Sequence, residues 1–169
     1  QDVEKIITDN KEVSEYVEKF LKDTGLETKV KLEIKQDVLN IYDIKEQIEK
    51  ANNRKIWLKC GGFITIDKTE ALTAIDVNSG KYIGSKDLDQ TIYTVNKEAT
   101  IEIAKQLRLR DIGGIIIIDY IDMENQETKQ KILKVLEESV KKDRSKIQIV
   151  GFTPLDLLEM TRKHICSND

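Results

Sequence analysis

The sequence predicts a layered α/β or α+β domain, in which helices cover a mixed sheet. Two observations support this class. Short apolar runs typical of strands alternate with longer segments whose apolar residues recur every three or four positions, as in helices. The continuous run Ile115–Ile118 also indicates a central strand buried on both faces. The 169 residues suffice for one sizeable domain, or for one domain and a fragment.

The beginning of the chain predicts two helices separated by a strand. Asp9 or Asn10 can cap the first helix, which Gly25 ends. Residues 29–35 alternate between polar and apolar side chains, which predicts a half-buried strand. A short helix is expected over residues 41–52, where isoleucines recur at helical spacing.

The composition changes near residue 53, from lysine- and glutamate-rich to more apolar. We therefore place a boundary between segments 1–52 and 53–169. The second segment opens with two predicted strands, 54–59 and 62–67, which are hinged at a pair of glycines. A third strand is predicted over residues 70–77.

The remaining chain alternates between helices and strands. Thr153 and Pro154 are suited to the N-cap and the first position of a final helix. The elements expected before them are a helix, a strand, a helix and a strand over residues 89–110, 115–120, 124–142 and 146–150.

Polar side chains stand at the ends of two predicted strands. Asp76 and Asn78 are two positions apart, so they point to the same face, and Asp119 ends another strand. If these strands are neighbours, Asp76 and Asp119 can converge on one Mg2+, which needs few protein ligands and can activate water against a phosphodiester. Asn78 would then bind a phosphate oxygen or orient the water. The alternative is that these residues are caps or turn residues.

Asp122 has two interpretations. It is either an outer partner of such a metal site or the cap of the helix expected from residue 124 onward. We favour the cap, because the residues from Glu124 onward have a helical pattern and Asp is a preferred N-cap.

Several stretches of this chain resemble the ribonuclease E/G family. The resemblance runs from about Gln47 to Lys163, and its motifs occur in the family's order. The matching stretches are Ile66–Ser79, Gln106–Gly114, Asp119–Met123, Asp143–Ile149 and Leu157–Arg162.

The resemblance implies an endoribonuclease of RNA processing and mRNA decay that cuts single-stranded RNA and leaves a 3′-hydroxyl and a 5′-phosphate. It implies a deoxyribonuclease I-like catalytic subdomain over residues 53–169, preceded by the trailing part of a ribonuclease H-like subdomain over 1–52. The family's Mg2+-binding aspartates fall on Asp76 and Asp119, and its phosphate-orienting asparagine falls on Asn78. Mn2+ is expected to substitute for Mg2+.

Parts of the family pattern have no match in this sequence. We recognise neither its OB-fold RNA-binding domain, nor its 5′-monophosphate pocket, nor the cysteine motif that links protomers through zinc. We therefore expect a fragment without structural zinc or a zinc-linked dimer, although the full-length protein can be a homo-oligomer. Two rival functions stay open: a non-catalytic RNA-binding or scaffolding piece, and a phosphoesterase or DNA-directed enzyme on the same fold.

Weaker candidates could contact RNA. Arg108, Arg110 and Lys81 could bind phosphates, but last-turn arginines are also favourable to the helix dipole without any ligand. Trp57, Tyr82 and Tyr93 could stack on bases, although for Trp57 we favour core packing. For the basic cluster at residues 141–146 we favour a solvated surface, and we expect no catalytic role for the single histidine, His164.

Net charge, cysteine positions and the length of apolar runs further narrow the classes of protein to which this chain can belong. The formal net charge of −3 is not that of a stand-alone nucleic-acid binder. Cys60 and Cys166 are far apart, which supports neither a disulfide framework nor a zinc site. No apolar run approaches the length of a membrane span, and we expect a cytoplasmic protein with reduced thiols.

Overall fold

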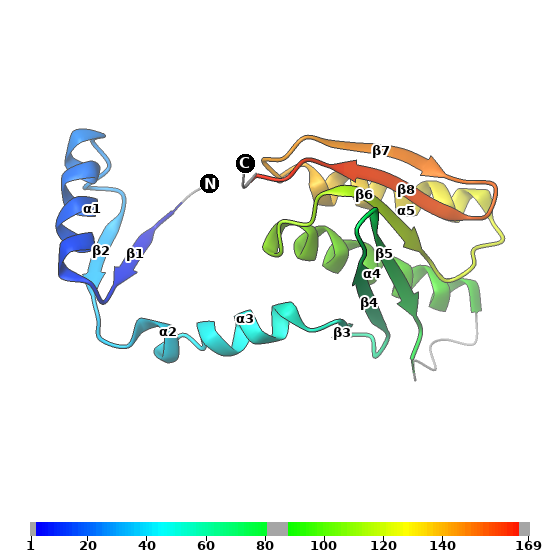
Figure 1. The fold of residues 1–169 in the computed structure, drawn as a ribbon, viewed down its shortest axis with the longest axis horizontal. Coiled ribbons are helices and arrows are strands. Elements are labelled where there is room, and N and C mark those ends of the chain that lie inside the picture. The colour runs from blue at the N-terminus through cyan, green and yellow to red at the C-terminus, as the bar shows by residue number, and fades with distance from the viewer. Residues whose placement is uncertain (1–2, 81–87, 166–169) are drawn as a thin grey trace. The chain divides into compact units, whose positions relative to one another are not determined.

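The computed structural model describes residues 3–80 and 88–165. The chain divides into two compact units, residues 1–49 and 50–169, and each is described by itself. Figure 1 labels the helices and strands of both units.

The first unit contains a strand–helix–strand arrangement. β1 (Lys5–Thr8) pairs in parallel with β2 (Lys31–Ile34), and α1 (Lys11–Asp23) connects them. The Asn10 side chain caps α1 by accepting a hydrogen bond from the backbone N–H of Val13 at 3.1 Å. The predicted helix and strand are therefore confirmed. β1 was not predicted, because its four residues are too few to display a period.

Two short helices follow where the sequence predicted one. They are α2 (Val38–Ile41) and α3 (Ile44–Asn52). Asp43 lies between them with a φ of 52°, in the left-handed region that an α-helix cannot contain. This residue therefore divides the predicted helix.

The second unit is built on a mixed six-stranded sheet with the strand order β3-β4-β5-β6-β8-β7. β5 and β6 run parallel, whereas the other neighbours in this sheet are antiparallel. The fold class predicted from the sequence is thus confirmed. The strands are β3 (Lys55–Trp57), β4 (Phe63–Lys68), β5 (Leu72–Asn78), β6 (Gly114–Asp119), β7 (Ile147–Phe152) and β8 (Leu157–Arg162).

Two helices cover one face of this sheet (Figure 1). α4 (Leu88–Leu109) contacts β4 and β5, α5 (Gln126–Val140) contacts β7, and the two helices pack against each other. Burying each large apolar side chain between these layers contributes about 1.5–3 kcal/mol. Within residues 3–80 and 88–165, no helix is long and apolar enough to cross a membrane. Fully buried core side chains include Ile64, Ile75, Val95, Ile103, Leu107, Ile116, Ile132, Leu136 and Leu158.

β6 is central, between β5 and β8, but it is not buried on both faces. Ile116 and Ile118 are completely buried, whereas Ile115 is 50% exposed. The prediction of a strand buried on both sides is therefore wrong. The physical reason is that α4 and α5 cover the same face and leave the opposite face, here called the open face, to solvent.

The predicted final helix is also wrong, because residues 157–162 form β8. The Thr153 hydroxyl does cap local backbone, but it accepts from the N–H groups of Leu155 and Leu157, both at 3.2 Å, within the turn between β7 and β8. A threonine followed by a proline is typical both of turns and of helix starts. Residues 157–162 form a strand because they pair with β6 and β7.

Arg162 at the end of β8 holds two loops of the second unit to this strand. Its side chain is completely buried, and its Nε donates to Asp143 Oδ2 at 2.9 Å. Its Nη1 donates to Asp111 Oδ1 at 2.8 Å and to the backbone oxygen of Ile112 at 2.9 Å. The guanidinium therefore joins β8 to the loop after α5 and to the loop before β6.

Replacing this arginine is expected to be costly. Arg162→Leu leaves Asp143, whose side chain is only 4% exposed, without its cation. Removing one partner of a buried pair costs about 3–5 kcal/mol, so we expect a loss of that size in the free energy of unfolding, measured by urea denaturation. Arg54→Leu is the matched control, because Arg54 pairs with Asp67 at an exposed position and its loss should change stability little.

Acid should weaken the same network. Burial opposes ionisation of Asp143, but hydrogen bonds from Arg162 and from the backbone N–H of Ser145 outweigh it and lower the pKa of this carboxyl. A lowered folded-state pKa gives stability that is complete above the unfolded pKa of about 4 and is lost as the pH falls through the folded value. Between about pH 6 and pH 2 we expect the wild type to lose more unfolding free energy than Asp143→Asn. Equal losses would contradict the assignment.

Candidate active site

Two carboxylates meet on the open face, at the ends of neighbouring parallel strands. Asp76 of β5 and Asp119 of β6 are directly paired in the strand register, and both are exposed. In β5, Thr73, Ile75 and Val77 point to the helices and are buried. Period-two alternation therefore forces Asp76 to the open face.

Asn78 lies on the same face and contacts the first carboxylate. Its Nδ2 donates a hydrogen bond to Asp76 Oδ2 at 2.6 Å. The amide thus orients one oxygen of a carboxylate, a group that has several lone pairs for further ligands. The structure brings together Asp76, Asn78 and Asp119, the three residues that the sequence analysis selected.

The electrostatics of this site favour a cation. Burial raises the pKa of the Asp119 carboxyl, and the nearby carboxylates of Asp76 and Asp122 raise it further. Crowded like charges of this kind are stabilised when a positive ion lies between them. Within the part of the chain that the structure describes, no group of three or more acidic, histidine or cysteine side chains is arranged to hold a metal. The site offers two carboxylates, Asp76 and Asp119, which are paired in the strand register.

Asp122 does not cap a helix. The N-cap of α5 is Asn125, whose side chain accepts from the backbone N–H of Glu127 at 2.7 Å. The preference for a capping Asp122 is therefore wrong. Asp122 is exposed and near enough to Asp119 to raise its pKa, which fits an outer position around the carboxylate pair.

Buried polar side chains of α4 hold the backbone that follows Asp119. Asn96 is completely buried, and its Nδ2 donates to the backbone oxygen of Ile121 at 2.8 Å while its Oδ1 accepts from the N–H of Ile121 at 3.1 Å. Beside it, the hydroxyls of Thr100 and Tyr120 are hydrogen-bonded at 2.8 Å. Sequence reasoning missed these residues. Their signal was polar side chains next to the apolar stripe of α4.

The residues that were weaker candidates for RNA contact differ in what their side chains do in the structure. Arg110 uses its guanidinium internally, donating to Gln106 Oε1 at 2.9 Å and to the backbone oxygen of Asn53 at 2.7 Å, and burial lowers its pKa. Arg108 is exposed at the end of α4. Lys81 and Tyr82 lie outside the described residues. His164 Nδ1 lies 2.9 Å from the backbone oxygen of Asp111 and takes no part in the carboxylate site.

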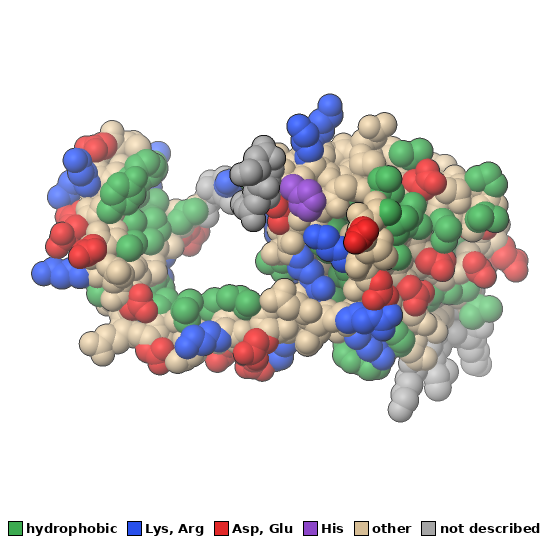
Figure 2. Space-filling model, viewed as in Figure 1, with side chains coloured by type: hydrophobic (Ala, Val, Ile, Leu, Met, Phe, Trp, Pro, Cys, Tyr) green, Lys and Arg blue, Asp and Glu red, His purple; other side chains and the backbone are tan. Residues whose placement is uncertain are grey.

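Trp57 is not a core residue. Its side chain is 61% exposed and packs edge-to-face against Phe63. The prediction of core packing is therefore wrong, because β3 is an edge strand and Trp57 lies on the open face. Figure 2 shows acidic, basic and hydrophobic side chains interspersed over the visible surface of the second unit.

Comparisons with known proteins find relatives that belong to one family. The family model described as Ribonuclease E/G family matches residues 1–165. Ribonuclease G of Salmonella typhimurium is 51% identical over 128 residues, which cover 76% of this chain and 26% of that protein. Ribonuclease G of Haemophilus influenzae is 41% identical over 165 residues, covering 95% of this chain and 33% of that protein. Ribonuclease E of Escherichia coli is 41% identical over 169 residues, covering 98% of this chain and 16% of that protein.

These coverages differ greatly between the two partners of each comparison. Nearly the whole chain is matched by the Haemophilus and Escherichia coli proteins, but it spans only a third or less of any of these three relatives.

Asn96, which holds the backbone that follows Asp119, gives a testable expectation. Asn96→Ala removes both hydrogen bonds to Ile121 and leaves its backbone groups without those partners, which costs about 1–3 kcal/mol. We expect this loss in chemical denaturation. Gln130→Ala, at an exposed position of α5, is the control and should change stability by less than about 0.5 kcal/mol. An Asn96 variant as stable as this control would show that the two hydrogen bonds contribute nothing.

Proposed function

This chain belongs to the ribonuclease E/G family, and we propose that it carries the catalytic centre of a magnesium-dependent endoribonuclease. Its substrate is single-stranded RNA in RNA processing and mRNA decay in the cytoplasm, and its products end in a 3′-hydroxyl and a 5′-phosphate. The relatives' names, Ribonuclease G and Ribonuclease E, support the general activity.

The observation that carries the proposal is the direct pairing of Asp76 with Asp119 across parallel strands. This pairing puts two hard oxygen donors from different strands on one exposed surface. Asn78 stands beside them, hydrogen-bonded to Asp76. Rigid strands hold all three groups, and such support is what a catalytic arrangement needs.

The donor set fits Mg2+, and Mn2+ would fit the same ligands. Magnesium uses one or two carboxylates and keeps several waters. Burial first, and then the charges of Asp76 and Asp122, raise the pKa of the Asp119 carboxyl, and a divalent ion would relieve the repulsion between these carboxylates. When bound, the ion would supply a polarised phosphoryl oxygen and a more acidic water.

The protein's own residues have separate roles in this proposal. Asp76 and Asp119 hold the ion, and Asn78 binds a non-bridging phosphate oxygen or orients Asp76. A neutral amide suits this position, because another carboxylate would repel the phosphate. Hydrolysis breaks the bond between phosphorus and the 3′ oxygen. The attacking water leaves its oxygen on the 5′-phosphate, and the 3′ oxygen gains a proton.

One rival function has an observation in its favour. The chain has a net charge of −3, which disfavours tight binding of a polyanion by this part alone. A non-catalytic RNA-binding or scaffolding role would be consistent with that charge. The rival provides no reason for two opposed carboxylates beside an asparagine, which the hydrolytic proposal requires.

Metal binding gives a direct test. Mn2+ that binds only the folded chain raises its melting temperature by mass action, so we expect a concentration-dependent rise for the wild type. Asp76→Asn and Asp119→Asn should abolish the rise. Without metal, neither variant should be less stable than the wild type, because each removes like-charge repulsion. Glu70→Gln, in the turn at the opposite end of β5, is the matched control and should keep the rise.

Cleavage provides the second readout. We expect a labelled single-stranded RNA to be cut in Mg2+ but not in EDTA, and a matched DNA to be cut more slowly. Both asparagine variants should lose the cleavage. A variant that retains wild-type cleavage, or a metal-induced rise that survives in both variants, would contradict the assignment of these carboxylates.

A further inference from the structure

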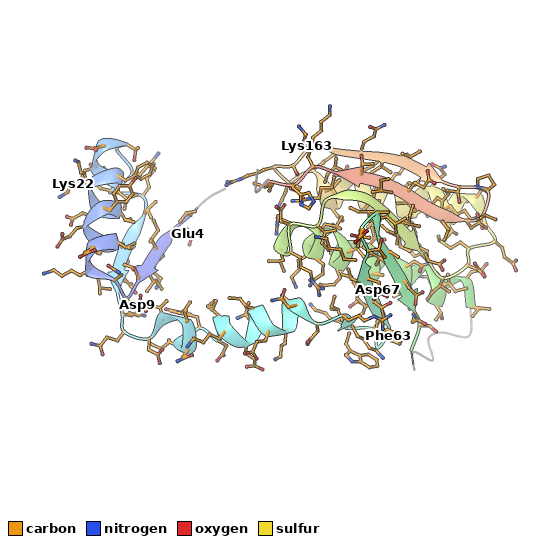
Figure 3. All side chains as sticks on the ribbon, viewed as in Figure 1. Glu4, Asp9, Lys22, Phe63, Asp67 and Lys163 are labelled. Atoms are coloured by element: carbon orange, nitrogen blue, oxygen red, sulfur yellow. The ribbon has the colours of Figure 1, made fainter. Side chains whose placement is uncertain are left out.

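An aromatic pair lies on the open face beside the candidate site. Trp57 of β3 pairs with Phe63 of β4, and Phe63 pairs in turn with Asn78 of β5. Directly opposed residues of antiparallel strands project from the same face, so these side chains share the face of Asp76. Two strand spacings, about 10 Å, separate the backbones of Trp57 and Asn78. Figure 3 labels Phe63 in this part of the sheet.

The two rings pack against each other, and Trp57 is exposed to solvent while Phe63 is half-buried. Their centroids are 5.2 Å apart with an interplanar angle of 61°, an edge-to-face arrangement. Trp57 is 61% exposed, whereas its neighbour Leu58 is 7% exposed and makes the core contact of this segment. The fold therefore does not need the indole for burial. Exposed aromatic rings are the platforms on which proteins stack the bases of single-stranded nucleic acids.

A cation accompanies the rings. Lys55 Nζ lies 4.2 Å from the Trp57 ring centroid and 3.6 Å from the Phe63 ring centroid. Lys55 also begins a second row across the same face, through Thr65 to Asp76. Lys55 thus belongs to the row that contains Asp76, and its ammonium reaches the neighbouring aromatic pair.

The turn that joins β3 to β4 is braced from α4. The Glu98 carboxylate accepts hydrogen bonds from the backbone N–H of Cys60, at 3.0 Å, and from that of Lys59. These bonds fix the turn between the two strands that carry the rings. The aromatic pair therefore has the rigid support that a stacking site requires.

We infer that Trp57, Phe63 and Lys55 form a stacking site for a base of single-stranded RNA, close to the phosphate held at Asp76, Asn78 and Asp119. This inference rests on the proposed ribonuclease function. The exposed part of the indole stacks on the base, and Lys55 neutralises an adjoining phosphate. An unpaired base is required, because a base inside a duplex keeps its faces stacked on its neighbours.

A base fits better here than an apolar protein segment. An ammonium group already contacts both rings, and a nucleotide presents a π face and an anionic phosphate a few ångströms apart. An apolar segment would instead have to bury the charge of Lys55. Stacking reads no base edge, so the site is expected to tolerate different bases.

Trp57 allows a direct experiment, because it is the only tryptophan of the chain. Its fluorescence is followed while a short A/U-rich single-stranded RNA is added in EDTA, so that neither metal binding nor cleavage is needed. We expect saturable quenching. The same sugar–phosphate chain without bases should bind more weakly and leave the fluorescence unchanged, and so should the RNA in a duplex.

Variants then distinguish stacking by the indole ring from the effect of an apolar side chain of any kind. Trp57→Leu keeps an apolar side chain but removes the π face, and it should weaken binding of a labelled RNA about tenfold. Trp57→Phe should retain most of the affinity. Lys55→Met should weaken binding and reduce its salt dependence, whereas Lys55→Arg should not. Ile101→Ala, at an exposed position of α4, is the control and should bind as the wild type does.

The outcomes distinguish this inference from the proposed function. Metal-dependent cleavage without quenching, or equal affinities for base-containing and base-free chains, would overturn the stacking site and leave the function intact. Quenching by RNA in a chain that binds no metal and cuts nothing would keep the stacking site and overturn the function. Absence of RNA binding, or quenching by an apolar peptide but not by RNA, would overturn the stacking site.

Discussion

The parallel pairing of β5 with β6 is the constraint on which the second unit depends. Parallel neighbours cannot be joined by a tight hairpin, so the chain must cross over the sheet between them. α4 lies in this crossover, and its apolar side builds the core against β4 and β5. The connection that brings Asp76 opposite Asp119 is therefore also the connection that buries the covered face. The crossover between β5 and β6 therefore produces both the fold of the second unit and the candidate site.

Buried polar side chains convert this topology into defined geometry. Asn96 holds the backbone just after Asp119, and Arg162 ties the end of β8 to the loop that leads into β6. Such groups are expensive to bury and must be fully hydrogen-bonded. Among the described residues no buried side-chain nitrogen or oxygen lacks a partner. Asn96 thus restrains the backbone that follows Asp119, whereas Arg162 restrains the opposite end of β6.

The two faces of the sheet have different chemistry. Helices bury one face, while the other presents opposed carboxylates, an amide, and an aromatic pair with a lysine within a few strand positions. Opposed carboxylates on a chain with a net charge of −3 do not attract RNA by themselves. A bound cation and local contacts such as Lys55 and Trp57 would have to supply that attraction. Substrate binding is therefore expected to depend on local chemistry and not on overall charge.

The sequence by itself determined the periodic features. Period-two alternation placed Asp76 and Asn78 on one face, helical spacing located α4 and α5, and Asp9 or Asn10 was predicted as a cap, of which the structure selects Asn10. Tertiary structure decided what local patterns cannot express. Thr153 and Pro154 signal a turn as well as a helix start, and only pairing with β6 and β7 makes the following residues a strand. Trp57 is apolar enough for a core, but the helices cover the other face. Neighbouring strands and the uncovered face depend on contacts between distant residues, and no local period encodes those contacts.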